Sequence, residues 1–248
     1  MLDLSRQSDI FPAAPTTPTL FAPLSLESAR FTFIGVGGIG SNAVNLVARL
    51  GAQHLTLFDP DTVQPENIAP GFFTVQDIED EKPFSVMNAI DSNLDLAQHI
   101  NAQPYEYMGQ EIASDVVIIS TDSMISRRDA WGWQERLGPW RLWIDCRMGG
   151  DQASLYVVYR PDERDHPDAR KVYREYLRDY EKSLRLPDTP LPCGLKSTAA
   201  LTVGMIPGMI GTVLYRAVWG QLPPKHLFYK MSAAWWTVVE STYVRKDE

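Results

Sequence analysis

The sequence predicts an α/β protein with a Rossmann-like, mostly parallel sheet that carries helices on both faces. The first observation is a βαβ pattern: an apolar run over 31–36, a glycine-rich turn, apolar residues at helical spacing over 43–50, and a second apolar run over 54–58. The second observation is that buried strands continue to alternate with helical patterns further along the chain. Strands separated by helices pair in parallel, and the helices then cover both faces of the sheet.

The remaining patterns extend this alternation to residue 219. We expect strands over 116–120, 142–145 and 154–159, and helices over 84–100, 127–137, 173–186 and 197–219. Pro207 predicts a kink in the last of these helices. Prolines spread through residues 1–30 predict an extended N-terminal arm, so we expect one folded domain over 31–248.

The composition excludes several classes of protein. The chain has 248 residues, of which 44% are hydrophobic, enough for one substantial core. Its formal net charge of -8 argues against nucleic-acid binding, because neutralising phosphates requires clustered Lys and Arg. No apolar run could span a membrane and the N-terminus lacks a secretory pattern, so we expect a cytoplasmic protein. Two cysteines exclude a disulfide framework and a Cys-only zinc site.

The glycine-rich turn has the spacing of a nucleotide-binding loop. Its glycines are Gly35, Gly37, Gly38 and Gly40, which fit G-x-G-x-x-G between a strand and a helix. Asp59 ends the next apolar run, where a carboxylate can accept hydrogen bonds from ribose hydroxyls. Glycines also permit tight packing of a helix on a strand, but packing alone does not require the acid. The motif does not distinguish NAD from ATP.

Four motifs, in order, resemble those of the ThiF/MoeB/ubiquitin-activating family. They are Gly35-Val36-Gly37-Gly38-Ile39-Gly40-Ser41, then Asp59-Pro60-Asp61-Thr62-Val63 through Asn67, then Asp77-Ile78 with Lys82, and Thr121-Asp122-Ser123 with Arg127. The resemblance covers about residues 30 to 160, while the rest of the chain matches in general plan only. It identifies residues 31–248 as a single ThiF-like adenylylation domain with a crossover loop near 180–196.

The resemblance implies an adenylyltransferase that uses ATP and Mg²⁺. Such enzymes activate the C-terminal carboxylate of a small ubiquitin-like or sulfur-carrier protein as an acyl adenylate, and a homodimer is expected. By position in the motifs, Asp59 would hold the ATP ribose, Asn67 and Lys82 would contact phosphates, Asp122 would bind Mg²⁺, and Gly35, Gly37, Gly38, Gly40, Asp61 and Arg127 would complete the site. Lys82 and the metal on Asp122 would stabilise charge on the phosphoryl oxygens during the reaction.

The chain departs from the family pattern in two places. Pro70 stands where the family has an arginine three residues after the motif asparagine, so Arg127, Arg128, Arg147 or a second subunit would have to supply that charge. The paired Cys-x-x-Cys motifs of many members are absent, and we expect no zinc. Residues 144–150 resemble a D-x-R-M-G-G stretch of phage- and plasmid-associated bacterial members. The alternative for Arg147 is a surface arginine in a turn.

The two cysteines have different expected roles. Cys193 lies in a proline-bounded loop before a predicted helix and next to Lys196, where a lowered thiol pKa would favour attack on an acyl adenylate. It is therefore a candidate catalytic residue that forms a thioester, and its alternative role is packing in a turn. Cys146 follows an apolar strand, which favours packing.

Two other functions share parts of this pattern. An NAD-dependent Rossmann oxidoreductase would use the glycine loop and Asp59, but it has no need of Asn67, Lys82 or Asp122. A non-catalytic scaffold subunit of the ThiF-like fold would explain the loss of the arginine at Pro70.

Overall fold

The computed structural model describes residues 22–94, 99–149, 151–164, 167–186, 196–230 and 235–239. The strands are β1 (Arg30–Ile34), β2 (His54–Phe58), β3 (Ile100–Gln103), β4 (Val116–Ile119), β5 (Leu142–Gly149), β6 (Gln152–Tyr159), β7 (His226–Lys230) and β8 (Trp235–Val239). The α-helices are α2 (Gly38–Arg49), α3 (Lys82–Leu94), α4 (Met124–Gly132), α5 (Ala169–Ser183) and α6 (Lys196–Val218). Short 3-10 helices cover Pro65–Asn67, Val75–Asp77 and Gln134–Leu137.

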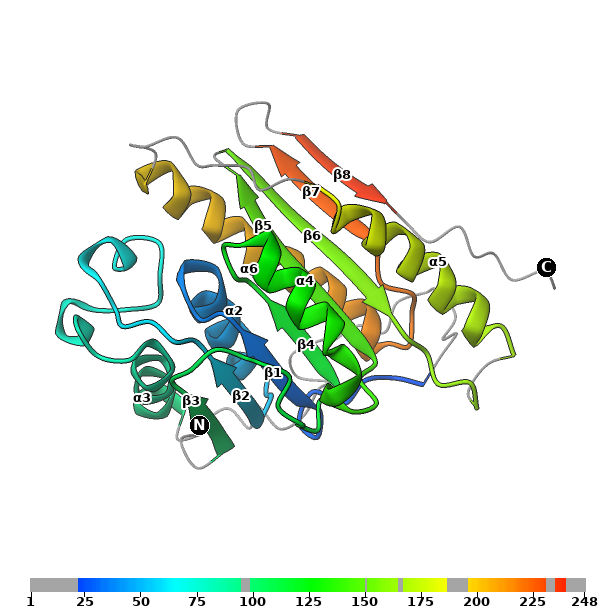
Figure 1. Cartoon of the computed structure of the whole chain (residues 1–248), viewed down its shortest axis with the longest axis horizontal. Helices are drawn as coiled ribbons and strands as arrows, with labels where there is room; N and C mark the ends of the chain where they lie inside the picture. Colours follow the sequence, from blue (N-terminus) through cyan, green and yellow to red (C-terminus); the bar gives the residue numbers. More distant parts are fainter. Residues whose placement is uncertain are drawn as a thin grey trace.

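Within the described ranges the strands form one sheet in the order β3-β2-β1-β4-β5-β6-β7-β8. The first five pair in parallel and the last three are antiparallel. Helices lie on both faces (Figure 1), which confirms the predicted Rossmann-like fold class. The chain moves outward from β1 through β2 to β3 and then returns to β4 on the other side of β1. The carboxyl ends of β1 and β4 therefore form the switch point at which open α/β sheets bind ligands.

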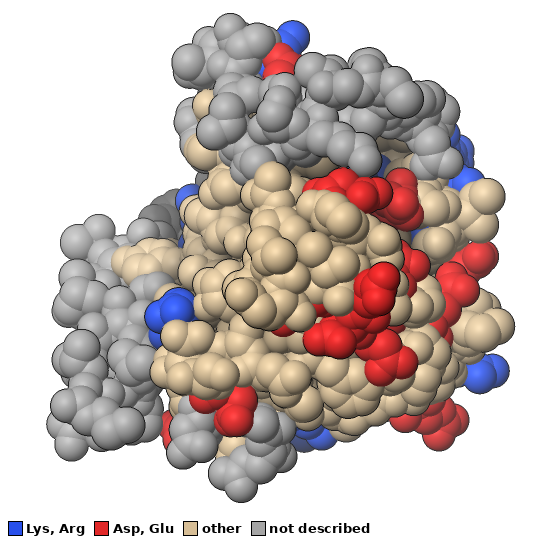
Figure 2. Space-filling model, turned by 90° about the vertical axis from the view of Figure 1, so that its left-hand side faces the viewer, with Lys and Arg blue, Asp and Glu red and all other residues tan. Residues whose placement is uncertain are grey.

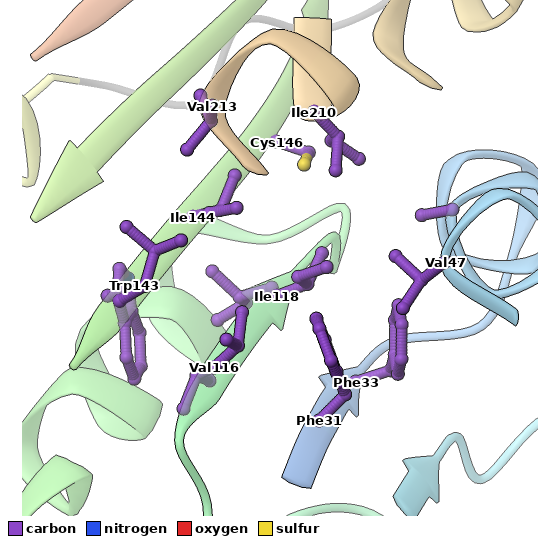
Figure 3. Close-up of a cluster of buried hydrophobic side chains, with 14 of the residues drawn as sticks. Phe31, Phe33, Val47, Val116, Ile118, Trp143, Ile144, Cys146, Ile210 and Val213 are labelled. Carbon is purple, nitrogen blue, oxygen red and sulfur yellow. The ribbon is translucent and has the colours of Figure 1, made fainter. Parts of the chain in front are cut away.

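Side chains of each buried strand point alternately to the two faces of the sheet, so the core has a layer on each face. In β5, Ile144 and Cys146 face α6, where Ile210 and Val213 cover them, as Figure 3 shows. Trp143 lies on the opposite face, and its ring meets the ring of Tyr180 from α5 at 6.2 Å. Adjacent residues of one strand thus belong to two different layers of the core.

Two sequence predictions for helices need correction. The helix expected over 84–100 ends at Leu94 in α3, and Ile100 begins the edge strand β3. The helix expected over 127–137 starts earlier, because the Ser123 hydroxyl accepts the amides of Ile125 and Ser126 and so caps α4. The final helix, expected over 197–219, is confirmed as α6 with Pro207 inside it. No helix in the described ranges has the length and apolar content to cross a membrane.

The described end of the N-terminal segment packs against the domain. Leu24 and Leu26 are buried, and the amide of Leu24 donates to the carbonyl of Ala217 at 2.9 Å. Residues 1–21 of the expected arm lie outside the described ranges.

Candidate active site

The glycines of the turn serve different purposes. Gly35 has a φ of 89°, and a Cβ there would lie 3.0 Å from backbone atoms of Ser120 and Thr121. A Cβ on Gly40 would collide with the carbonyl oxygen of Gly35. A Cβ on Gly37 would meet no described atom within 4 Å. Tight packing therefore explains Gly35 and Gly40, whereas Gly37 borders open space at the start of α2.

The N-terminus of α2 has no side-chain cap. Gly37 is its N-cap residue, and the amide of Ser41 donates to the Gly37 carbonyl at 3.0 Å as the first bond of the helical ladder. The amides before Ser41 belong to the helix end whose N–H groups find no intrahelical acceptor. Such an end, next to open space at Gly37, can bind an anion.

Asp59 fixes the glycine turn to the end of β2. Its Oδ2 accepts the amide of Val36 at 2.6 Å and its Oδ1 accepts the amide of Asp61 at 3.0 Å. The carboxylate is buried, and burial raises the pKa of Asp59 despite the opposing effect of Lys82. Asp59 at the end of β2 thus orders the glycine turn that follows β1.

Lys82 places a buried cation beside these acids. Its Nζ lies 2.7 Å from Asp61 Oδ2 and 3.7 Å from Asp59 Oδ1. The side chain of Lys82 is only 8% exposed, whereas that of Asp61 is 66% exposed. Lys82 is the first residue of α3, where the helix dipole disfavours a cation, so the carboxylates offset its burial. Asp59, Asp61 and Lys82 come together at the carboxyl edge of the sheet.

Asn67 and Pro70 lie on the segment between β2 and α3. The Asn67 side chain accepts the amide of Gln64 at 2.9 Å and so caps its own turn. The Asn42 amide donates to the carbonyls of Gly38 at 2.7 Å and Pro70 at 2.9 Å, which ties this segment to the glycine turn. Pro70 also lies against Gly38, since a Cβ there would be 3.2 Å from the Pro70 Cβ. An apolar ring therefore borders the turn.

Asp122 follows β4 at the same edge of the sheet. The hydroxyl of Ser120 donates to the Gly35 carbonyl at 2.8 Å, which joins the loop after β4 to the glycine turn. The side chain of Asp122 is exposed and makes no ion pair within the described ranges. It is thus the accessible carboxylate of this loop, and its position after the strand agrees with the predicted one.

Arg127 and Arg147 share one buried carboxylate. Asp145 is fully buried in β5, with Arg127 bonded to its Oδ1 and Arg147 bonded to its Oδ2 at 2.6 Å. The side chain of Arg147 is 13% exposed, so the interpretation as a surface arginine in a turn is wrong. Two of the three arginines expected to replace the family arginine, Arg127 and Arg147, are thus held by Asp145. The third, Arg128, donates to the carbonyl of Leu184 at 3.2 Å. No described contact joins any of the three to Lys82.

Asp145 is the functional candidate that sequence reasoning missed. The signal was a charged residue inside an apolar strand, between Ile144 and Cys146. A buried carboxylate needs a partner. The distant partner, Arg127, is supplied by α4 and is visible only in three dimensions.

Acidic side chains gather on the face shown in Figure 2. That view faces the side of the molecule where the segment between β2 and α3 lies in Figure 1. This segment carries the exposed acids Asp61, Glu66, Glu79, Asp80 and Glu81. A polyphosphate that approaches Lys82 therefore meets a negative surface potential, which a divalent cation would reduce.

The cysteine that the structure describes, Cys146, is a core residue. Cys146 is fully buried, beside Ile210 of α6 in Figure 3. Burial raises the pKa of its thiol, which makes it unreactive. Cys193 and the rest of residues 187–195 lie outside the described ranges.

The fold and the site together define a Rossmann-like α/β protein whose glycine turn is followed by paired acids and a buried lysine. The chain belongs to the ThiF family, whose family model matches residues 22–241.

Proteins of known identity are similar to this chain in a short stretch of sequence or in fold. A segment of 45 residues is 42% identical to the adenylyltransferase and sulfurtransferase UBA4 of Yarrowia lipolytica, and it covers 18% of this chain and 11% of UBA4. Among solved structures, MccB of E. coli with ATP superposes with a TM-score of 0.60 at 11% identity, covering 87% of this chain and 64% of MccB. PaaA gives a TM-score of 0.58 at 13% identity, covering 87% of this chain and 64% of PaaA. These superpositions show the fold, and the chain spans less than two thirds of either protein.

Proposed function

We propose that this chain binds ATP with Mg²⁺ and activates a carboxylate as an acyl adenylate. The observation that carries the proposal is the buried Lys82, with its Nζ 2.7 Å from Asp61 and 3.7 Å from Asp59 at the carboxyl edge of the sheet. A cation there serves a polyphosphate. An NAD-dependent oxidoreductase has no use for it, which disfavours that alternative.

The glycine turn supports the phosphate part of the proposal. The open space beside Gly37 and the uncapped start of α2 suit an anion. Asp59 suits ribose hydroxyls, although it already accepts the amide of Val36. We assign Asp61, Asn67 and Arg127 to the same site by their positions in the family motifs. In this structure Asp61 pairs with Lys82 and Arg127 pairs with Asp145. The Asn67 side chain caps its own turn.

The residues present fit Mg²⁺ bound together with ATP. No described group of three or more His, Cys, Asp or Glu side chains could hold a metal ion by itself. Mg²⁺ is commonly held by one or two carboxylates together with substrate phosphates and waters. The exposed Asp122 supplies such a carboxylate. The ion would stabilise charge on the phosphoryl oxygens, and Lys82 would add a second positive charge.

The substrate, the covalent step and the assembly are also proposals. UBA4 is named an adenylyltransferase, and MccB has been solved both with ATP and with MccA. We therefore infer a small ubiquitin-like or sulfur-carrier protein as the substrate whose carboxylate is activated. Thioester formation on Cys193 is proposed as a second step from the position of this residue before α6. The homodimer and the cytoplasmic location remain predictions.

ATP:pyrophosphate exchange tests the proposal. The assay uses small ubiquitin-like and sulfur-carrier proteins from the source organism, each with a free C-terminal carboxylate and as a C-terminal amide. We expect exchange with one of the free carboxylates and none with its amide. MgATP binding without exchange for any of them would favour the scaffold alternative, to which the loss of an arginine at Pro70 points.

A further inference from the structure

We infer that Asp145 is a positioning residue that links the loop carrying Asp122 to the last turn of α5. The link runs through Arg127 on one side and Arg147 on the other. It rests on the proposed function only in that Asp122 is assigned to the ATP site.

The carboxylate of Asp145 is shared between two cations. Arg127 bonds to Oδ1, while Arg147 donates to Oδ2 through Nη2 at 2.6 Å and Nε at 2.9 Å. The hydroxyl of Tyr180 lies 3.2 Å from the same Oδ2. Asp145 has no exposed surface, so its carboxylate depends on these partners to offset the cost of burying a charged side chain.

Each guanidinium has a second contact that leads away from Asp145. Arg127 donates to the carbonyl of Thr121, the residue directly before Asp122. Arg147 donates to the Ser183 carbonyl at 3.0 Å and to its hydroxyl at 2.9 Å. Ser183 is the last residue of α5. One carboxylate therefore holds both segments through planar, multidentate donors.

The surroundings leave the network little freedom. The Arg147 guanidinium lies 4.3 Å from the centre of the Tyr156 ring, and Trp143 Nε1 donates to the Tyr180 hydroxyl at 2.9 Å. Asp145 is also the strand partner of Ile119, the last residue of β4. The loop that carries Asp122 follows this strand. Arg128 adds a parallel connection, since it donates to the Leu184 carbonyl at 3.2 Å. A displacement of the loop is thus transmitted to the end of α5.

Two matched substitutions separate positioning from simple stability. Arg127→Lys and Arg147→Lys each keep a positive charge next to Asp145, but one ammonium cannot span both contacts of the guanidinium it replaces. Arg160→Lys is the control. Arg160 stacks near Trp140 at 5.8 Å and Tyr173 at 5.7 Å, on aromatic rings of the same region, without contacting Asp145.

Hydrogen exchange on the full chain without nucleotide is the first measurement. In Arg127→Lys we expect the amides of Leu184 and Arg185, bonded to Tyr180 and Lys182, to exchange about tenfold faster, as for loss of one charge-assisted hydrogen bond. In Arg147→Lys we expect the same acceleration of exchange for the amides of Ser126 and Arg127, in the first turn of α4. Amides of β1 should keep their rates in both variants. The inference would be overturned if the amides named for each variant exchanged at wild-type rates. It would also be overturned if exchange became faster by the same factor throughout the chain.

MgATP gives the second measurement. We expect MgATP to slow amide exchange at Leu184 and Arg185 in the wild type and in Arg160→Lys. In Arg127→Lys and Arg147→Lys we expect no such slowing. If wild-type protein binds MgATP and these amides do not respond, the inference is wrong. If it binds no MgATP, the proposed function fails, while the nucleotide-free experiment still decides the role of Asp145.

Discussion

Asp59 accepts the amide hydrogen of Val36 at 2.6 Å, so the acid that ends β2 holds the glycine turn that follows β1. Its second oxygen accepts the amide of Asp61. An asparagine could satisfy only one of these amides and would direct its NH₂ group at the other. For Asp59→Asn we expect a loss of about 1–3 kcal/mol in the free energy of unfolding.

MgATP affinity should also fall by at least about tenfold in Asp59→Asn. Denaturant unfolding and calorimetric titration measure the two effects. Asp80→Asn, which changes an exposed acid of the same acidic face, is the control and should leave both values unchanged. Wild-type affinity in Asp59→Asn would remove Asp59 from the site.

Asp122 should matter for activity and not for folding. Because its side chain is exposed and unpaired within the described ranges, Asp122→Ala should change the free energy of unfolding by less than about 0.5 kcal/mol. ATP:pyrophosphate exchange should fall by about 10²–10³, the usual effect of losing one stabilising contact to the reacting group. Asp129→Ala, which removes an exposed acid of α4 close to this loop, should retain exchange. Parental exchange in Asp122→Ala would refute the metal assignment.

The glycine turn and Asp59 were predictable because their spacing is local in sequence. Lys82 came only from the family resemblance, since a single lysine before a predicted helix has the pattern of a surface charge. The Asp145 network was not predictable, because its residues come from β5, α4 and α5 and only the fold brings them together. The pattern predicts a helix up to residue 100, the first residue of β3, because Ile100 continues the apolar spacing of α3.

Substitution of Cys193 and of Cys146 should have different effects on formation of a covalent adduct. Cys193→Ala should keep ATP:pyrophosphate exchange with the cognate partner and lose an adduct that is sensitive to reducing agent. Cys146→Ala should keep both, since the Cys146 thiol is fully buried and burial raises its pKa. Mass spectrometry after incubation with ATP and the partner compares the variants. An adduct that persists in Cys193→Ala, or that maps to Cys146, would contradict this assignment.

His226 should make the protein less stable in acid. Its ring stacks on Tyr156 at 4.2 Å, and its buried Nε2 has no hydrogen-bond partner among the residues that the structure describes. Burial, and secondly Arg147, lower the pKa of His226 from 6.5 to about 4. The unfolded chain therefore binds more protons between these values, so the stability present above pH 6.5 is lost as the pH falls toward about 4.

Because the His226 ring keeps partial contact with water, we expect this loss to be about 2 kcal/mol. His226→Phe should remove this part of the pH dependence. Denaturant unfolding at a series of pH values compares the two proteins. Parallel profiles for the wild type and the variant would show that His226 does not titrate in this way.

Nucleotide-dependent thermal stability tests the central claim most directly. Because Lys82 lies 2.7 Å from Asp61 and directly follows the exposed acids Glu79, Asp80 and Glu81, we expect ATP to bind well only with Mg²⁺. MgATP at about 100 times its Kd should then stabilise the wild type by about 2.7 kcal/mol and raise its Tm. NADH should leave the Tm unchanged, and Lys82→Met should lose the response to MgATP. A Tm that rises with NADH and not with MgATP would contradict the account.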